Sequence, residues 1–170
     1  RFEDCTVFLT DETTERLVLA ASGGNLANRR GETPYRVGEG VTGWVAEHGV
    51  AVRLVEPQRD PRWQGLCLEF PEEDIGALLA VPIVGRKRVL GVLRVVRRKS
   101  PTAWFSNAFS EGEERVLTTI GRQLGAAVEN VRSYERLIKA ERMAAWGELS
   151  ARAAHMIGNR TFALKGDLNE

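Results

Sequence analysis

Residues 77–96 read ALLAVPIVGRKRVLGVLRVV, two strongly apolar runs joined by the short turn GRKR at residues 85–88. Each run has the length of one strand and is rich in the β-branched and aliphatic residues that strands favour. A short turn of glycine and basic residues between two such runs is typical of a hairpin. We therefore predict an antiparallel hairpin with strands at 77–84 and 89–96.

Shorter elements precede this hairpin. The runs CTVFLTD at 5–11 and RLVLAASG at 16–23 flank the polar turn ETTE and predict a first hairpin. A short helix is expected at 41–49, ended by Gly49, and a further strand at 51–56. The connections at 23–40 and 57–74 are rich in glycine, proline and polar residues, and we predict both to be loops. Long loops on a small sheet more often carry a binding site than not.

A long helix is predicted from Ser110 onward. Ser110 and Glu113 have the spacing of a capping box, and the acidic residues of the first turn suit the positive end of the helix dipole. No proline follows Pro101, so the helix is expected to run to the end of the chain. The fold class is therefore predicted to be α+β, an antiparallel sheet flanked by helices and followed by a long C-terminal helix.

This helix carries an apolar seam with the alternating steps of four and three residues that are typical of a two-stranded parallel coiled coil. After residue 138 the seam continues only if two stutters are inserted, each of which locally unwinds a supercoil. The alternative is a helix that packs on its own sheet for three turns and is loose afterwards. The predicted dimer seam consists of Ile120, Leu124, Ala127, Val131, Tyr134, Ile138, Leu149, Ala153 and Met156.

Composition gives several exclusions. The 24 Lys and Arg residues balance 23 Asp and Glu residues, so no overall field points to a nucleic-acid partner. Basic residues gather only at 86–99, where we interpret them as a solvated turn and strand end.

No run approaches the roughly 18 apolar residues of a membrane span, so we expect a soluble chain with no membrane segment. The two cysteines, Cys5 and Cys67, have neither the number nor the spacing of a disulfide framework or a metal site, which favours the reducing cytoplasm. The first residues resemble the middle of a strand, so we expect a piece of a longer protein.

The segments at 38–63, 77–100 and 109–137 together resemble a GAF domain, a sensory module of many regulatory proteins. The resemblance covers most of residues 1–137 in the order of the family. It implies the fold, but leaves the ligand unknown, because GAF domains use one scaffold for cyclic nucleotides, haem, bilins, small metabolites or no ligand.

The resemblance implies a ligand pocket between the sheet and the two long loops. Its candidate residues are Trp44, Trp63, Leu66, Cys67, Phe70 and Ile75. Core packing is the alternative for each aromatic residue. Cys67 could anchor a bilin or respond to an oxidant, but the histidine usual beside a bilin-binding cysteine is missing, which favours a buried thiol. His48 could bind haem iron, but its place before Gly49 favours a helix C-terminal cap.

The tail from residue 140 resembles the first helix of the dimerisation and phosphoacceptor domain of a sensor histidine kinase. The match rests on His155, Ile157 and Asn159, preceded by the small-residue run GELSARAA. It departs from the family pattern at Met156, where a carboxylate is usual, and at Arg160, where proline is usual. The resemblance implies a GAF domain at 1–133, a coiled-coil linker at 134–143 and the truncated phosphoacceptor helix at 144–170.

Helical geometry places the predicted phosphoacceptor away from the seam. At about 100° per residue, His155 lies roughly 120° from the centre of the stripe formed by Leu149, Ala153 and Met156. Asn159 lies on the same side of the helix as His155. A neutral imidazole facing water can attack the γ-phosphoryl group of ATP, and Asn159 could orient a water for the reverse dephosphorylation. The domain that binds ATP is not in this chain, which we expect to be inactive alone.

The predicted function is thus the sensory and phosphoacceptor part of a homodimeric histidine kinase, with ATP, its own ATP-binding domain and a response regulator receiver domain as partners. The alternative is a ligand-binding GAF module that dimerises to regulate a transcription factor or a cyclase, with the sequence around His155 a chance likeness.

Overall fold

A computed structural model of the chain describes residues 4–23, 26–32, 35–67, 69–100, 102 and 106–166, with side chains as far as residue 155. The strands are β1 (Asp4–Asp11), β2 (Arg16–Ser22), β3 (Tyr35–Arg36), β4 (Val52–Val55), β5 (Ile75–Val84) and β6 (Val89–Arg98). They form one antiparallel sheet in the order β3-β2-β1-β6-β5-β4. Both predicted hairpins are therefore confirmed, and so is the α+β class with an antiparallel sheet.

Two α-helices accompany the sheet, α1 (Gly40–His48) and α2 (Glu111–Gly166). As predicted, α1 ends at Gly49, whose left-handed backbone (φ 67°) lets its N–H donate to the Val45 carbonyl at 3.0 Å. The two connections also contain the short 3₁₀ helices η1 (Ala27–Arg29), η2 (Pro57–Arg59) and η3 (Glu72–Asp74).

The prediction that 23–40 is only loop was wrong, because this segment contains η1 and β3. Tyr35 and Arg36 pair with Leu17 and Arg16 and so add an edge strand to the sheet. A strand of two residues has no repeating pattern in the sequence, and the pairing depends on a partner strand about eighteen residues away.

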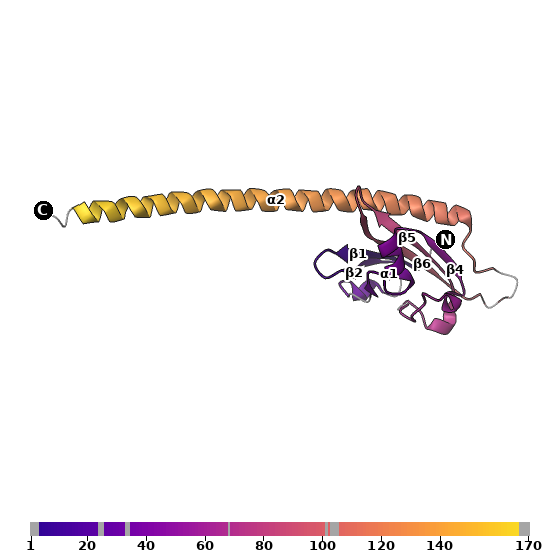
Figure 1. Ribbon diagram of the computed structural model, residues 1–170. Coiled ribbons are helices and arrows are strands. Elements are labelled where there is room, and N and C mark those ends of the chain that lie inside the picture. The colour runs from indigo at the N-terminus through magenta and orange to yellow at the C-terminus, as the bar shows by residue number, and fades with distance from the viewer. Residues whose placement is uncertain are drawn as a thin grey trace. The chain divides into compact units, whose positions relative to one another are not determined.

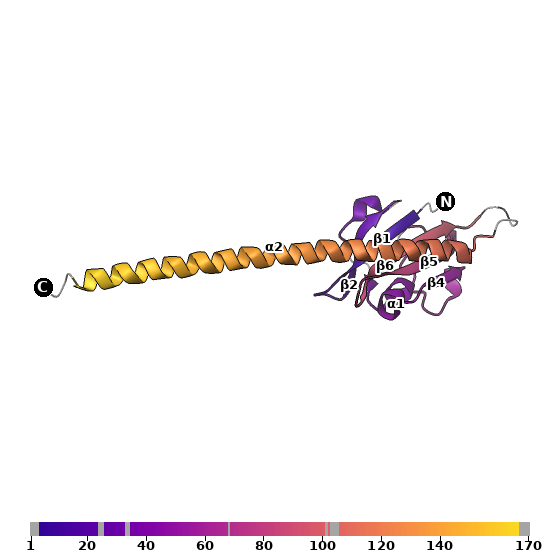
Figure 2. The same ribbon diagram turned by 90° about the horizontal axis from the view of Figure 1, so that it is seen from above.

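Alternating side chains give the sheet two apolar faces, each covered by one α-helix (Figures 1 and 2). On β5, Leu78 and Ala80 face a core shared with Val45 of α1. Their neighbours Leu79 and Val81 face a second core shared with Leu117 of α2. The long connections lie on the α1 side, where Phe70 and the partly buried Trp63 pack, so that face holds the predicted sensory site.

The start of α2 approaches the sheet closely because its contact face carries glycine. A Cβ atom at Gly121 would lie 2.8 Å from the Pro82 carbonyl oxygen, and one at Gly125 only 2.0 Å from that of Val84. Leu117, Leu124 and Val128 complete this contact stripe. Leu124, which was predicted for the dimer seam, is half-buried against its own sheet, and its place in the seam stays a prediction.

The predicted capping box at the start of α2 is present. Glu113 N donates to Ser110 Oγ at 3.2 Å, and Ser110 N donates to Glu113 Oε2 at 2.8 Å. Two backbone N–H groups that a helix start leaves unsatisfied are thereby paired. The Ser110 N–H and the Arg97 guanidinium hold the pKa of the Glu113 carboxyl below its ordinary value.

Replacing Ser110 with alanine should lower the free energy of unfolding by about 1 kcal/mol, because Glu113 N then loses its acceptor. Ser133→Ala, at an exposed position within α2, should leave it unchanged or slightly raised. Urea unfolding followed by circular dichroism compares the two variants. Equal midpoints for both would show that the box does not stabilise the helix.

By internal contacts the chain divides into two compact units, residues 1–129 and 130–170. The first contains the sheet, α1 and the part of α2 that packs on the sheet. The described part of the second is the remainder of α2, to Gly166. The domain boundaries that we predicted at 133 and 143 rest on the sequence and stay predictions.

Candidate sensory site and phosphoacceptor helix

The six predicted ligand residues gather at the core beneath α1. Phe70 and Ile75 are buried members of that core, and Trp44, Trp63, Leu66 and Cys67 are partly buried against it. The fold thus brings Trp44 into the same core as Phe70 and Ile75, which lie 26 and 31 positions further along the chain. Because Phe70 and Ile75 are 6% and 0% exposed, these two act as packing residues in this structure. A role in ligand binding stays a prediction for all six.

The two tryptophans each have polar partners from their own chain. The Trp44 ring stacks on His48 with centroids 4.2 Å apart, and the Arg62 guanidinium lies 4.6 Å from its centroid. His48 Nδ1 lies 3.0 Å from the Trp44 carbonyl, so His48 satisfies the end of α1 as a cap would. Trp63 Nε1 donates to Glu72 Oε1 at 2.6 Å.

At the centre of this face lies a buried ion pair that the sequence analysis missed. Arg94 of β6 and Glu69 of the β4–β5 connection are 2% and 4% exposed. Arg94 donates to Glu69 Oε1 from Nη2 at 2.5 Å and from Nε at 3.2 Å. A buried charge is strongly unfavourable unless it is paired and hydrogen-bonded, and this pair meets both conditions.

Hydroxyl and thiol groups complete the hydrogen bonding of the pair. Arg94 Nη1 donates to Tyr35 Oη and to Thr42 Oγ1, each at 2.7 Å. Glu69 accepts from Thr6 Oγ1 at 3.0 Å and from Cys67 Sγ at 3.0 Å. The cluster thus joins β1, β3, α1, β6 and the β4–β5 connection, and we call these six residues the Arg94 cluster.

Aromatic rings enclose the guanidinium. Its carbon lies 4.9 Å from the centroid of Phe8 and 5.1 Å from that of Tyr35, and the two rings meet edge to face at 5.2 Å. A cation is attracted to the face of an aromatic ring, more strongly where water is excluded. The rings therefore hold Arg94 in place while its donors point at the carboxylate and the hydroxyls.

Burial and charge fix the protonation states in the cluster. Burial opposes ionisation of Glu69, but the Arg94 guanidinium outweighs it and holds the pKa of this carboxyl below its ordinary value. Burial raises the pKa of the Tyr35 phenol and of the Cys67 thiol, each to about 12. Cys67 is therefore a thiol at neutral pH, as the sequence analysis favoured, and not a reactive thiolate.

A signal for Arg94 was available in the sequence, but none for Glu69. Arg94 interrupts the run VLRVV at a position whose alternate neighbours, Val92 and Val96, face the α1 core. A charge at that position must be buried and must have a partner. The partner lies 25 positions away in an irregular connection, where one glutamate looks like any other.

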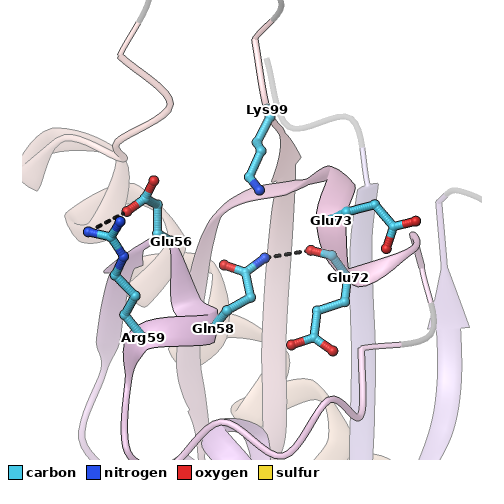
Figure 3. Close-up of a pocket in the computed structure, with 6 residues that line it drawn as sticks. All are labelled: Glu56, Gln58, Arg59, Glu72, Glu73 and Lys99. Carbon is cyan, nitrogen blue, oxygen red and sulfur yellow. Dashed lines mark hydrogen bonds and ion pairs between the residues drawn. The ribbon is translucent and has the colours of Figure 1, made fainter.

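An open pocket of about 460 Å³ lies at the η2 and η3 end of the domain (Figure 3). Gln58 Nε2 donates to the Glu72 carbonyl at 2.5 Å and to the Ile75 carbonyl at 3.0 Å. Glu56 pairs with Arg59 at 3.0 Å. The pocket is lined by Glu56, Gln58, Arg59, Glu72, Glu73 and Lys99. None of these is among the predicted ligand residues.

Outside its contact stripe on the sheet, α2 displays apolar side chains to water. Val131, Tyr134 and Leu149 are 59%, 66% and 62% exposed, Ile120 stands at 36%, and Ala127 and Ala153 are exposed. Ile138 is half-buried. Exposed apolar side chains at regular spacing favour a partner surface, although a single chain contains no coiled coil.

His155 lies on the exposed part of α2, and its side chain is exposed. The backbone at residues 156–166 is helical, so Met156 and Asn159 continue the same helix. The side chains of Met156 and Asn159 lie outside the described residues. In the part of the chain with described side chains, no three His, Cys, Asp or Glu residues form a group suited to a metal ion. No helix within the described ranges is both long and apolar enough to span a membrane.

Comparison with protein families matches residues 1–129 to the GAF domain. Among solved structures, the chain is similar to the GAF domain of a phosphoenolpyruvate-protein phosphotransferase (ptsP) from Coxiella burnetii. The identity is 26%, the TM-score is 0.68, and the match covers 79% of this chain and 76% of that one. The corresponding Acinetobacter domain gives 25% identity and a TM-score of 0.65, with 79% and 75% covered.

A curated relative is the dual 3′,5′-cyclic-AMP and -GMP phosphodiesterase 11A of Takifugu rubripes, 24% identical over 139 residues. The match covers 76% of this chain but only 15% of the phosphodiesterase, so the chain spans a small part of that relative. The chain belongs to the GAF domain family. It therefore contains a sensory module, as the resemblance of its three segments predicted.

Proposed function

We propose that this chain is the sensory and phosphoacceptor part of a homodimeric histidine kinase in which the GAF domain controls phosphorylation of His155. The observation that carries the proposal is the continuity of α2 from Glu111 to Gly166. One helix packs on the sheet at its start and carries the exposed His155 later in its course. In this proposal a change of packing at the sheet acts on the residues around His155 through this helix.

The chemistry is phosphoryl transfer from ATP. An imidazole nitrogen of His155 forms a bond to the γ-phosphorus while the bond from that phosphorus to the ADP oxygen breaks. The catalytic domain that positions ATP is supplied by the rest of the protein, and a receiver domain accepts the phosphoryl group. In this proposal Asn159, one turn after His155, orients a water for dephosphorylation, which releases inorganic phosphate.

A non-kinase role is the second candidate. It is favoured by the relatives, which include a cyclic-nucleotide phosphodiesterase and GAF domains of phosphoenolpyruvate-protein phosphotransferases. In that case the GAF domain and the seam of α2 regulate another output. The gene beyond Glu170 separates the two candidates, because only a kinase needs a second, antiparallel helix and an ATP-binding domain there.

Phosphate labelling tests the role of His155 directly. With ATP and a competent catalytic domain, the native chain should acquire acid-labile, alkali-stable phosphate, and His155→Ala should acquire none. His48→Gln is the matched control, because it replaces the other histidine and should label as the native chain does. Equal labelling of the native chain and His155→Ala would exclude the proposed phosphoacceptor.

Dimerisation through the seam gives a separate prediction. Val131→Glu combined with Ile138→Glu should raise the dimer dissociation constant at least ~100-fold, because each chain would bury two carboxylates against its partner. Ser133→Glu combined with Ala140→Glu adds the same charges with the same spacing, about 200° around the helix, and should leave the dimer intact. Sedimentation equilibrium measures both variants. A native chain that is monomeric at high micromolar concentration would contradict the seam.

A further inference from the structure

The Arg94 cluster contains more polar chemistry than a stable core needs. Arg94 occupies a β6 position between Val92 and Val96, where an apolar side chain would extend the core beneath α1. Replacing a buried ion pair with apolar residues of similar volume is often neutral or stabilising. Packing alone therefore does not account for an arginine at this position.

The donors of the cluster are arranged as they would be around a bound carboxylate. Glu69 Oε1 accepts from Arg94 Nε, Arg94 Nη2 and Thr6 Oγ1 at 3.2, 2.5 and 3.0 Å. Glu69 Oε2 accepts from Cys67 Sγ at 3.0 Å. Charge-assisted bonds of this kind are the strongest that proteins make to carboxylates. The Glu69 carboxylate thus occupies a formed anion site.

The site and its occupant come from different kinds of structure. Arg94 and Thr6 lie directly opposite each other on the neighbouring central strands β6 and β1. Tyr35 and Thr42, which hold Arg94 Nη1, belong to β3 and α1. Glu69 belongs to the irregular β4–β5 connection, between η2 and η3. One hydrogen bond, from Tyr35 Oη to the Leu66 carbonyl, ties the residues that hold Arg94 to the connection, and the others do not depend on it, so the anion site can persist when the connection releases its carboxylate.

We propose that Arg94 and Thr6 form the recognition site of the GAF domain for a small organic carboxylate, which Glu69 occupies as an internal ligand until the carboxylate displaces it. The buried charge stays balanced, because one anion replaces another on Arg94 while Glu69 moves into water. Displacement also withdraws Glu69 from Thr6 and Cys67 and so changes the β4–β5 connection. This inference rests on the sensory role of the domain and not on the phosphorylation of His155.

Competition with Glu69 makes the proposal measurable. While Glu69 occupies the site, a free carboxylate can bind only to the fraction of molecules in which the site is open. Its apparent affinity is therefore the intrinsic affinity multiplied by that fraction. Removing the Glu69 carboxylate should therefore raise the affinity for acetate by at least about tenfold. Acetamide, which has the same shape but no charge, should not bind.

The experiment compares the native chain with Glu69→Ala and with Glu69→Ala combined with Arg94→Met. Binding of formate, acetate and benzoate is followed by the NMR signal of the Arg94 Nε–H group, with chloride at equal ionic strength as reference. We expect all three carboxylates to shift this signal in Glu69→Ala, and at least one to shift it, at higher concentration, in the native chain. The double variant should not bind acetate by calorimetry. Glu113→Ala, which removes a carboxylate from the surface ion pair with Arg97, is the matched control and should gain no acetate affinity.

The native chain decides the proposal if the variants fail to fold. No shift of its Arg94 signal with any of the three carboxylates at 50 mM would show that Glu69 is a permanent structural partner, and would overturn the proposal. A folded Glu69→Ala variant that prefers acetate no more than chloride would overturn it as well. Neither result depends on ATP, so a failure here is distinguishable from a failure of His155 labelling.

Discussion

Arg94→Met should lower the free energy of unfolding by about 3–5 kcal/mol, a large part of the stability of a small domain. Methionine fills much of the space of arginine but leaves the Glu69 carboxylate buried at 4% exposure without a counter-charge. It also removes the donor to Tyr35 and Thr42. Urea unfolding at pH 7, followed by tryptophan fluorescence, measures the loss.

The pH dependence of Arg94→Met should have the opposite sign to that of the native chain. In the native chain the pKa of Glu69 is lowered, so its contribution is complete above the ordinary carboxyl pKa of about 4.3 and is lost as the pH falls below that value. In the variant, burial without Arg94 raises the pKa of Glu69. Protonation then relieves the buried charge, and the variant should recover stability as the pH falls from 7 to 5.

A double replacement separates the lost charge from the lost packing. Arg94→Met combined with Glu69→Met should be at least about 2 kcal/mol more stable than Arg94→Met alone, because no buried charge remains unpaired. A single variant that is as stable as the double one, with no recovery at pH 5, would show that Glu69 leaves the core once Arg94 is gone, and would contradict the expected loss of about 3–5 kcal/mol.

Gly125→Ala should destabilise the domain more than a methyl group added anywhere else in α2. We expect it to lower the free energy of unfolding by about 3 kcal/mol. The added Cβ would lie 2.0 Å from the Val84 carbonyl oxygen and 2.6 Å from its carbonyl carbon, and neither backbone atom can rotate away. The helix must shift from β5 or the strand must bend. Either change removes buried contacts of Leu117 and Val128 with the sheet. Denaturant unfolding of the domain measures the effect.

Gly147→Ala is the matched control within the same helix. Apart from the helix's own neighbouring backbone, no described atom lies within 4 Å of the added Cβ. In a helix interior, alanine is more favourable than glycine by up to about 1 kcal/mol. This variant should leave the unfolding midpoint unchanged or slightly raised. If Gly125→Ala behaved as Gly147→Ala does, α2 would not rest on β5 as closely as described.

Local pattern was sufficient for most of the fold. The run at 77–96 predicted β5 and β6 because a strand and its turn leave their signature in neighbouring residues. The capping box of Ser110 and Glu113 predicted the start of α2 for the same reason, since both partners lie within one helical turn. The GAF resemblance agreed with these elements, and the match over residues 1–129 confirmed it.

The assignment of Leu124 shows where a helical pattern is insufficient. Leu124 lies within about 40° of both the seam at Ile120 and the sheet stripe at Val128, so periodicity at 100° per residue places it equally well in either. The close approach of α2 at Gly121 and Gly125 packs Leu124 against the sheet, and its place in the seam stays a prediction. Val131 and Tyr134, beyond that contact, keep the exposure that the seam requires.

The sequence by itself determined the two hairpins, the strand β4, the helix starts, the family and the candidate phosphoacceptor, because each is encoded in residues that are close along the chain. Only the tertiary structure decided that β3 completes the sheet, that Leu124 packs on it, and that Arg94 and Glu69 meet beneath α1. The contacts of the Arg94 cluster join segments up to 63 positions apart, from Thr6 to Glu69. The free energy of burying a charge with its partner depends on where the folded chain places both, and no local pattern of residues carries that information.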